Sequence, residues 1–154
     1  MKQIIKQKAS DNTYYHQDFH IALNYGINYL HKSFGGEAVR EYLAQFANAY
    51  FAPLKKELRD KGLPVLKEHY EKIYKIENAV FHMNISPHDL FIHLSESPAV
   101  MYIKTNGHPV SSLYQETVIT VNKEICRNTP YDCELAEYKH ENGAYKLRFF
   151  KRKM

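Results

Sequence analysis

Two histidines near the start of the chain, His16 and His20, have the spacing that most suggests chemistry. Side chains four residues apart share one face of a helix, and paired helical histidines are frequent zinc ligands. Asp18 lies on the opposite side of that turn and cannot join them. We therefore predict that His16 and His20 bind a metal, with a divalent cation such as Zn²⁺ as the cofactor. The alternative is that both histidines pack between helices and bond to tyrosines or backbone.

Three further side chains could take part in catalysis: Glu116, Cys126 and Cys133. A nucleophilic cysteine needs a nearby base and a lowered pKa, and a helix carboxylate transfers protons well if a pocket desolvates it. We predict these three residues as the catalytic candidates. Cys126 falls near a predicted helix end, where the dipole disfavours a thiolate, and Cys133 alternates with an apolar residue. Two buried structural thiols and a solvated glutamate are the alternative.

Tyrosine is unusually frequent, since the chain holds 13 Tyr and 8 Phe but no Trp. Because tyrosine combines an apolar ring with a polar tip, many of these side chains should line the core boundary or a pocket wall. The residues predicted to bind a substrate are Tyr15, Tyr42, Tyr114 and Asn122. Tyr114 and Asn122 belong to the same late helix as Glu116.

The elements that position these side chains divide the chain into two halves. Residues 11–77 have helical spacing, with apolar stripes that repeat every three or four residues. Asp, Asn and Thr at 11–13 can cap the first helix. Later boundaries come from glycine, which ends helices, and from proline, which suits their first turn. The predicted boundary residues are Gly35 and Gly36, Glu37, Pro53, Gly62 and Pro64.

From residue 79 the hydrophobic period changes to two, which is typical of strands. Residues 79–151 predict two β-hairpins with one helix between them, the second turning at Asn142-Gly143. A short connection bracketed by Pro98 and Pro109 precedes that helix, which Ser111 or Ser112 would cap and which runs to about residue 127.

The histidines of the first hairpin, His82 and His93, fall on the strand face opposite the apolar residues. If helices cover only one face of the sheet, both side chains are exposed to solvent. If another chain covers the second face, they line an interface instead.

The predicted fold is therefore α+β: an N-terminal helical half followed by ββαββ, with a four-stranded antiparallel sheet and helices packed mainly on one face. We expect a single domain over residues 1–154, because this length can bury a substantial core. Within it, residues 1–10 form a flexible lead-in, 11–77 the helical part and 79–151 the ββαββ part.

Charge and hydropathy exclude two classes of partner. The net charge is only +4, and much of it comes from a C-terminal run rather than the broad basic face of a nucleic-acid binder. No stretch approaches the roughly 20 apolar residues of a membrane helix, and the polar start is unlike a signal peptide. We expect a cytoplasmic protein with reduced thiols and neither nucleic acid nor membrane as partner.

Several segments together resemble a known family. They are the Tyr- and His-bearing first helix, residues 34–38 (Phe-Gly-Gly-Glu-Ala), 96–99 (Glu-Ser-Pro-Ala), 125–126 (Ile-Cys) with 130–133 (Pro-Tyr-Asp-Cys), and the last hairpin with 147–149 (Leu-Arg-Phe). With these segments the chain resembles L-2-amino-thiazoline-4-carboxylic acid hydrolase-like proteins, which are akin in architecture to 4-vinyl-reductase and TRAPP-type domains. Relatives often have Cys-Pro where this chain has Ser97-Pro98, so any function of that cysteine is missing here.

Three functions follow from these observations. The resemblance implies a small hydrolase that cleaves a cyclic C–N bond in a heterocyclic amino acid. The tyrosines and phenylalanines favour, as an alternative, a non-catalytic binding or sensor module with a pocket between the two halves. The third hypothesis is a homodimer in which the histidines are structural.

Overall fold

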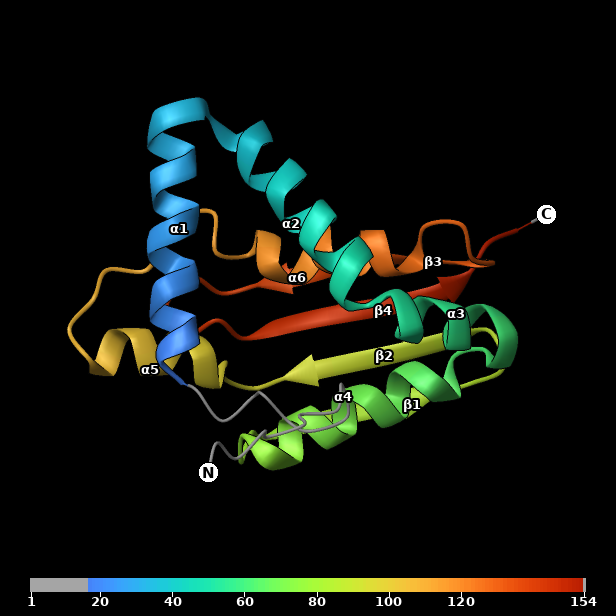
Figure 1. Cartoon of the computed structure of the whole chain (residues 1–154). Coiled ribbons are helices and arrows are strands. Elements are labelled where there is room, and N and C mark those ends of the chain that lie inside the picture. Colours follow the sequence, from blue (N-terminus) through green and yellow to red (C-terminus); the bar gives the residue numbers. More distant parts are fainter. Residues whose placement is uncertain (1–16, 154) are drawn as a thin grey trace, which may run out of the picture.

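The computed structural model describes residues 17–153 and places helices on one face of a four-stranded antiparallel sheet (Figure 1). The predicted α+β class, with the helices first and the strands after them, is confirmed. The N-terminal half consists of four consecutive helices: α1 (Asp18–Phe34), α2 (Gly36–Tyr50), α3 (Ala52–Lys61) and α4 (Pro64–Ile76). The elements that follow are β1 (Phe81–Ile85), β2 (Asp89–Leu94), α5 (Pro98–Thr105), α6 (Glu116–Cys126), β3 (Tyr131–Tyr138) and β4 (Tyr145–Lys151).

Glycine and proline set the helix boundaries as the sequence predicts. Gly35 ends α1 with φ at 92°, a conformation that glycine adopts without strain, and its N–H bonds to the carbonyl of His31. Pro53 lies in the first turn of α3 and Pro64 opens α4, where proline's missing N–H costs nothing. The capping residues predicted at 11–13 and the lead-in at 1–10 lie outside the described residues.

The sheet has the strand order β1-β2-β4-β3, and all its pairs are antiparallel. Alternate residues of β2 and β4 are buried against the helices, which explains the period of two in the sequence. Phe149 and Leu147 on central β4 are almost completely inaccessible to solvent. The helix-facing side of the sheet therefore forms the floor of the core.

Two helices, and not one, connect the hairpins. The predicted short connection after Pro98 is helix α5, whose start is capped by Ser97: its Oγ accepts a hydrogen bond from the N–H of Val100 at 3.3 Å. Helix α6 begins at Glu116, beyond the predicted caps. Ser111 instead accepts a hydrogen bond from the N–H of Leu113, within the turns that precede α6.

The buried residue Asn24 fixes α1 relative to the loop between α5 and α6. Its Nδ2 donates to the carbonyl of Pro109, and its Oδ1 accepts from the N–H of Ser111, both at 2.8 Å. A buried amide with both groups satisfied stabilises one defined packing of the two segments. This contact determines how the first turns of α1 approach the rest of the fold.

The second face of the sheet carries polar and aromatic side chains, and no described helix covers it. His82 and His93 lie opposite each other on β1 and β2, and both are exposed, as predicted for a sheet covered on one face. Arg148 on the same face forms ion pairs with Asp89 at 2.6 Å and Glu134 at 3.2 Å. None of the described helices is long and apolar enough to cross a membrane.

Candidate functional site

A cavity of about 450 Å³ lies between the helical half and the sheet. Its volume falls within the roughly 300–1,000 Å³ that is usual for small-molecule sites. Helices α1, α2, α4, α5 and α6 contribute to its wall, together with the ends of β2, β3 and β4. Most of the lining is apolar or aromatic, including Phe19, Leu23, Phe46, Phe51, Ile73 and Val118.

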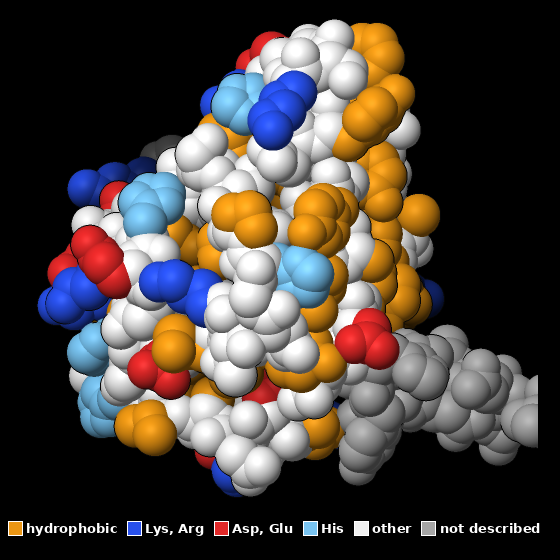
Figure 2. All heavy atoms as spheres, turned by 90° about the vertical axis from the view of Figure 1, so that its left-hand side faces the viewer, with side chains coloured by type: hydrophobic (Ala, Val, Ile, Leu, Met, Phe, Trp, Pro, Cys, Tyr) orange, Lys and Arg blue, Asp and Glu red, His pale blue; other side chains and the backbone are white. Residues whose placement is uncertain are grey.

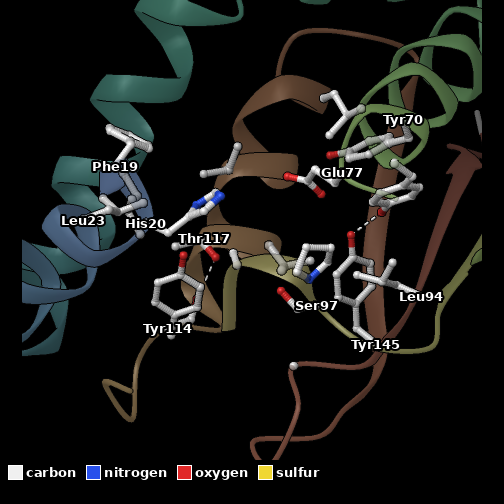
Figure 3. Close-up of a pocket in the computed structure, with 18 of the residues that line it drawn as sticks. Phe19, His20, Leu23, Tyr70, Glu77, Leu94, Ser97, Tyr114, Thr117 and Tyr145 are labelled. Carbon is white, nitrogen blue, oxygen red and sulfur yellow. Dashed lines mark hydrogen bonds between the residues drawn. The ribbon is translucent and has the colours of Figure 1, made fainter. Parts of the chain in front are cut away.

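Hydrogen bonds hold three of the lining tyrosines in place. The hydroxyls of Tyr74 on α4 and Tyr145 on β4 bond to each other, and so connect a helix to the sheet (Figure 3). The Tyr70 hydroxyl donates to Oδ1 of Asn122, whose Nδ2 donates to the carbonyl of Val118 at 2.8 Å. Because these phenols are fixed by partners, the adjacent cavity wall is preformed.

Two ionisable side chains from opposite sides point into the cavity. Figure 3 shows His20 extending from α1 and Glu77 extending from the residue after α4, with Thr117 and Tyr114 beside the imidazole. Burial lowers the pKa of His20 below its usual value of 6.5. The imidazole is therefore largely neutral at neutral pH, and a neutral imidazole can both donate and accept a hydrogen bond.

His69 on α4 is a second neutral imidazole in the wall. Its ring packs edge-on against Phe51 at 5.8 Å and Tyr70 at 5.2 Å between centroids. Burial among these rings, and secondarily the charge of Lys72, lowers the pKa of His69 to about 4. No described residue hydrogen-bonds to the His69 ring.

This shift predicts an acid-dependent loss of stability. The folded protein keeps His69 neutral down to a pKa of about 4, whereas the unfolded chain protonates it near 6.5. The contribution of the neutral His69 side chain to the free energy of unfolding is therefore complete above pH 6.5. It is lost as the pH falls toward 4, by at most about 1.4 kcal/mol per pH unit. Urea unfolding should give a shallower pH dependence for His69→Gln than for wild type over this window. The exposed His88→Gln is the control, and identical slopes for His69→Gln and wild type would contradict the assignment.

The tyrosines of the cavity are uncharged hydrogen-bonding groups. Burial raises the pKa of Tyr70, Tyr74, Tyr114 and Tyr145 well above the usual 10, and that of Tyr138 to about 12. The negative charge of the Glu77 carboxylate adds to the raised pKa of three of them: Tyr74, Tyr114 and Tyr145. Among residues 17–153, the cavity lining therefore combines phenol hydroxyls, two imidazoles and one carboxylate in an apolar wall.

The three predicted catalytic residues lie away from the cavity lining. Cys126 and Cys133 are fully buried in the core, and hydrogen bonding between the two thiols, together with burial, raises the pKa of Cys126. A thiol held in its protonated form is a poor nucleophile. Glu116 is buried between helices, where Arg40 lies 3.3 Å away and Thr120 donates a hydrogen bond at 2.5 Å. Through its contact with Arg40, Glu116 joins α6 to α2 as a packing residue.

The predicted binding residues divide into three groups. Tyr114 lines the cavity, as does His20 of the predicted metal pair. Asn122 lies behind Tyr70 and orients it, and Tyr42 is about half exposed outside the lining. Tyr15 and His16 lie outside the described residues. Within residues 17–153 no three His, Cys, Asp or Glu side chains come together to hold a metal, so the pair with His16 stays a prediction.

Sequence reasoning missed two polar groups of the cavity, His69 and Glu77. For Glu77 the available signal was helical spacing, because this residue follows directly after α4 and continues the spacing of Tyr70 and Tyr74, which are seven and three residues before it. A glutamate that continues an aromatic stripe toward the core indicates a polar site. No local pattern shows that this face meets α1 across a cavity.

Comparison with known proteins identifies no family for this chain. No protein-family model matches the chain, and no curated protein matches it in sequence. The resemblance to L-2-amino-thiazoline-4-carboxylic acid hydrolase-like proteins therefore stays a prediction.

Proposed function

We propose that the protein binds a small, largely apolar molecule in the cavity between its helices and its sheet. The observation that carries this proposal is a 450 Å³ space with an apolar wall and a few convergent polar groups. Sites for small molecules have this composition, in which apolar area supplies affinity and a few polar side chains fix orientation.

Two physical arguments support a binding role over a simple packing defect. The wall is lined mostly by apolar and aromatic side chains, which gain dispersion contacts when a ligand packs against them. The wall is also rigid, since Tyr70, Tyr74 and Tyr145 are hydrogen-bonded in place. A preformed wall lowers the entropic cost of binding.

A thermal-shift screen of the purified full chain tests this proposal. Aliphatic and aromatic compounds that fit the cavity should raise the melting temperature, because a ligand at one hundred times its Kd stabilises the folded state by about 2.7 kcal/mol. Larger members of the same series, such as long-chain sterol esters, serve as controls that exceed the cavity. A flat response across all fitting compounds would contradict the proposal.

Hydrolysis of a cyclic C–N bond is the second candidate, and the cavity offers chemistry for it. The neutral imidazole of His20 can accept a proton, and Glu77 provides a carboxylate in the same space. His69 is a weaker base, because its pKa is lowered to about 4. A zwitterionic heterocyclic amino acid matches an apolar wall less well than a lipophilic ligand does. Incubation with 2-aminothiazoline-4-carboxylate separates the binding proposal from the hydrolase proposal, because the absence of any product would contradict hydrolysis.

Self-association is a third proposal, and it is compatible with ligand binding. The side of the molecule formed by α1 and α5 carries a band of hydrophobic side chains along one edge (Figure 2). On α1 and α2, large apolar or aromatic side chains are about half exposed or more: Phe19, Tyr25, Tyr29, Phe34, Tyr42 and Tyr50. Burial of such a surface between two copies would favour a homodimer. Light scattering that gave a monomer mass at high concentration would remove this proposal.

A further inference from the structure

We propose that the natural occupant of the cavity is an apolar molecule with an uncharged carbonyl group, whose oxygen accepts a hydrogen bond from the Tyr114 hydroxyl. This inference rests on the proposed function and specifies the chemical class of the ligand. Three observations carry it: the burial of Tyr114, the lack of a partner for its hydroxyl among the described residues, and the character of the surrounding wall.

Tyr114 is a buried residue whose backbone is fixed by hydrogen bonds. Only 5% of its surface is exposed, and it lies in the turns directly before α6. Its N–H bonds to the carbonyl of Ser111 at 3.0 Å, and its own carbonyl accepts from Oγ1 of Thr117 at 2.7 Å. These bonds use the backbone of Tyr114 and leave its hydroxyl available. Figure 3 shows the ring in the cavity wall, with the hydroxyl on the side where His20 and Thr117 lie.

The Tyr114 hydroxyl opens onto the cavity. Within residues 17–153 no side chain or backbone group forms a hydrogen bond with it. Every completely sealed polar side-chain atom in this part of the chain does have a hydrogen-bond partner. A hydroxyl without one must therefore touch open space, and for Tyr114 that space is the cavity that it lines. Because buried tyrosine hydroxyls usually find a partner, a bound ligand is the one we expect here.

The other phenols of the lining are less suited to this role. The hydroxyls of Tyr74 and Tyr145 bond to each other, and that of Tyr70 is donated to a side-chain amide. Tyr138 is only partly buried, so solvent reaches part of its surface. Tyr114 thus combines deep burial with an available hydroxyl.

The surroundings of Tyr114 favour an acceptor that carries no charge. Burial raises the pKa of Tyr114 above the usual value of 10, so the phenol keeps its proton and donates it to a hydrogen bond. The same loss of solvation penalises a carboxylate at this place, and no lysine or arginine among residues 17–153 lines the cavity to compensate it. An ammonium group has no lone pair with which to accept. The carbonyl of an apolar ketone, aldehyde, ester or amide meets both conditions.

Acetophenone and α-methylstyrene test this hydrogen bond, because they have nearly the same shape and differ in C=O against C=CH₂. In Tyr114→Phe we expect isothermal titration to give a Kd for acetophenone about tenfold weaker than in wild type, with the Kd of α-methylstyrene unchanged. Benzoate, an anion of similar size, should bind wild type more weakly than acetophenone does. The infrared carbonyl stretch of bound acetophenone should lie at lower frequency in wild type than in Tyr114→Phe.

Two controls separate a ligand contact from a structural role of the hydroxyl. Tyr131→Phe is the matched variant, because it removes a hydroxyl from a partly buried tyrosine outside the lining, and it should bind both ligands as wild type does. Without ligand, Tyr114→Phe should unfold at the same urea concentration as wild type or a higher one, because the hydroxyl it removes has no partner in the described protein. A clear destabilisation would show that the hydroxyl is bonded within the protein and would overturn the assignment.

The outcomes also separate this inference from the proposed function. An unchanged Kd of acetophenone in Tyr114→Phe, equal losses for both ligands, or the same loss in Tyr131→Phe would overturn the carbonyl assignment and leave a binding cavity. Tighter binding of benzoate than of acetophenone would do the same. Failure of both acetophenone and α-methylstyrene to bind wild type would overturn the carbonyl assignment together with the proposed function.

Discussion

Replacement of Ala99 by phenylalanine is expected to weaken ligand binding by about 100-fold or more while the fold is retained. Ala99 lies in the first turn of α5 and its small side chain forms part of the cavity wall. A phenyl ring at this position would occupy space inside the 450 Å³ cavity that a ligand requires. Because the ring enters an open space rather than a filled core, we expect little destabilisation, in contrast to the usual cost of overpacking.

The measurement is a titration of wild type and Ala99→Phe with octanol, accompanied by the unfolding midpoint of each protein. Ala22→Phe is the matched control, because Ala22 is on a helix that contributes to the cavity but its own side chain is exposed and outside the lining. Wild-type affinity in a folded Ala99→Phe protein would show that the ligand binds elsewhere.

Replacement of Gly143 by alanine is expected to destabilise the protein by about 2–5 kcal/mol, which combines backbone strain with overpacking. Gly143 has φ at +71°, a region that residues with a side chain rarely adopt. A Cβ atom there would lie 2.6 Å from both Cβ of Ser97 and Cγ2 of Val100. Since Ser97 caps α5, the clash would displace the helix that carries Ala99 into the cavity wall.

Gly107→Ala separates the two contributions to this effect. Gly107 has a similar φ of +79°, but a Cβ atom would meet nothing within 4 Å. We expect Gly107→Ala to lower the free energy of unfolding only by the cost of backbone strain, about 1–2 kcal/mol. Urea unfolding of both variants makes the comparison, and equal losses would mean that the turn between β3 and β4 is not tightly packed against α5.

Local signals were sufficient for most of the fold. Glycine and proline mark helix ends through backbone conformation alone, and so Gly35, Gly62 and Pro64 predicted their boundaries correctly. The exception is α5, a helix of eight residues that begins with proline and is followed by Asn106 and Gly107. Such a segment resembles a loop in sequence, and only the cap formed by Ser97 distinguishes it.

The site was less predictable, because it depends on contacts between segments far apart in the sequence. The tyrosine-rich composition predicted a pocket wall, and Tyr114 and His20 do line the cavity. His69 and Glu77 were missed, since their partners across the space come from α1, β4 and the turn before α6. A single sequence shows which helix face is apolar, but it does not show which faces meet.

For the two cysteines, residue type and position in the sequence pointed to different roles. Reactive residue types at Cys126 and Cys133 suggested catalysis, while the helix end and the strand alternation suggested burial. The structure buries both and pairs their thiols, as the packing alternative describes. The position of each cysteine in its element therefore predicted its burial, whereas a catalytic role for either thiol stays a prediction.

The most direct test of the central claim is a methyl NMR titration of the full chain with octanol. Leu23, Val118 and Val121 line the cavity, and their methyl resonances should shift together and saturate with one Kd. Leu58 and Leu66 are equally buried or more so but lie in the core outside the lining, and their resonances should stay unchanged. Shifts confined to surface residues, or no shift of the three lining methyls at saturating ligand, would contradict a binding cavity between the helices and the sheet.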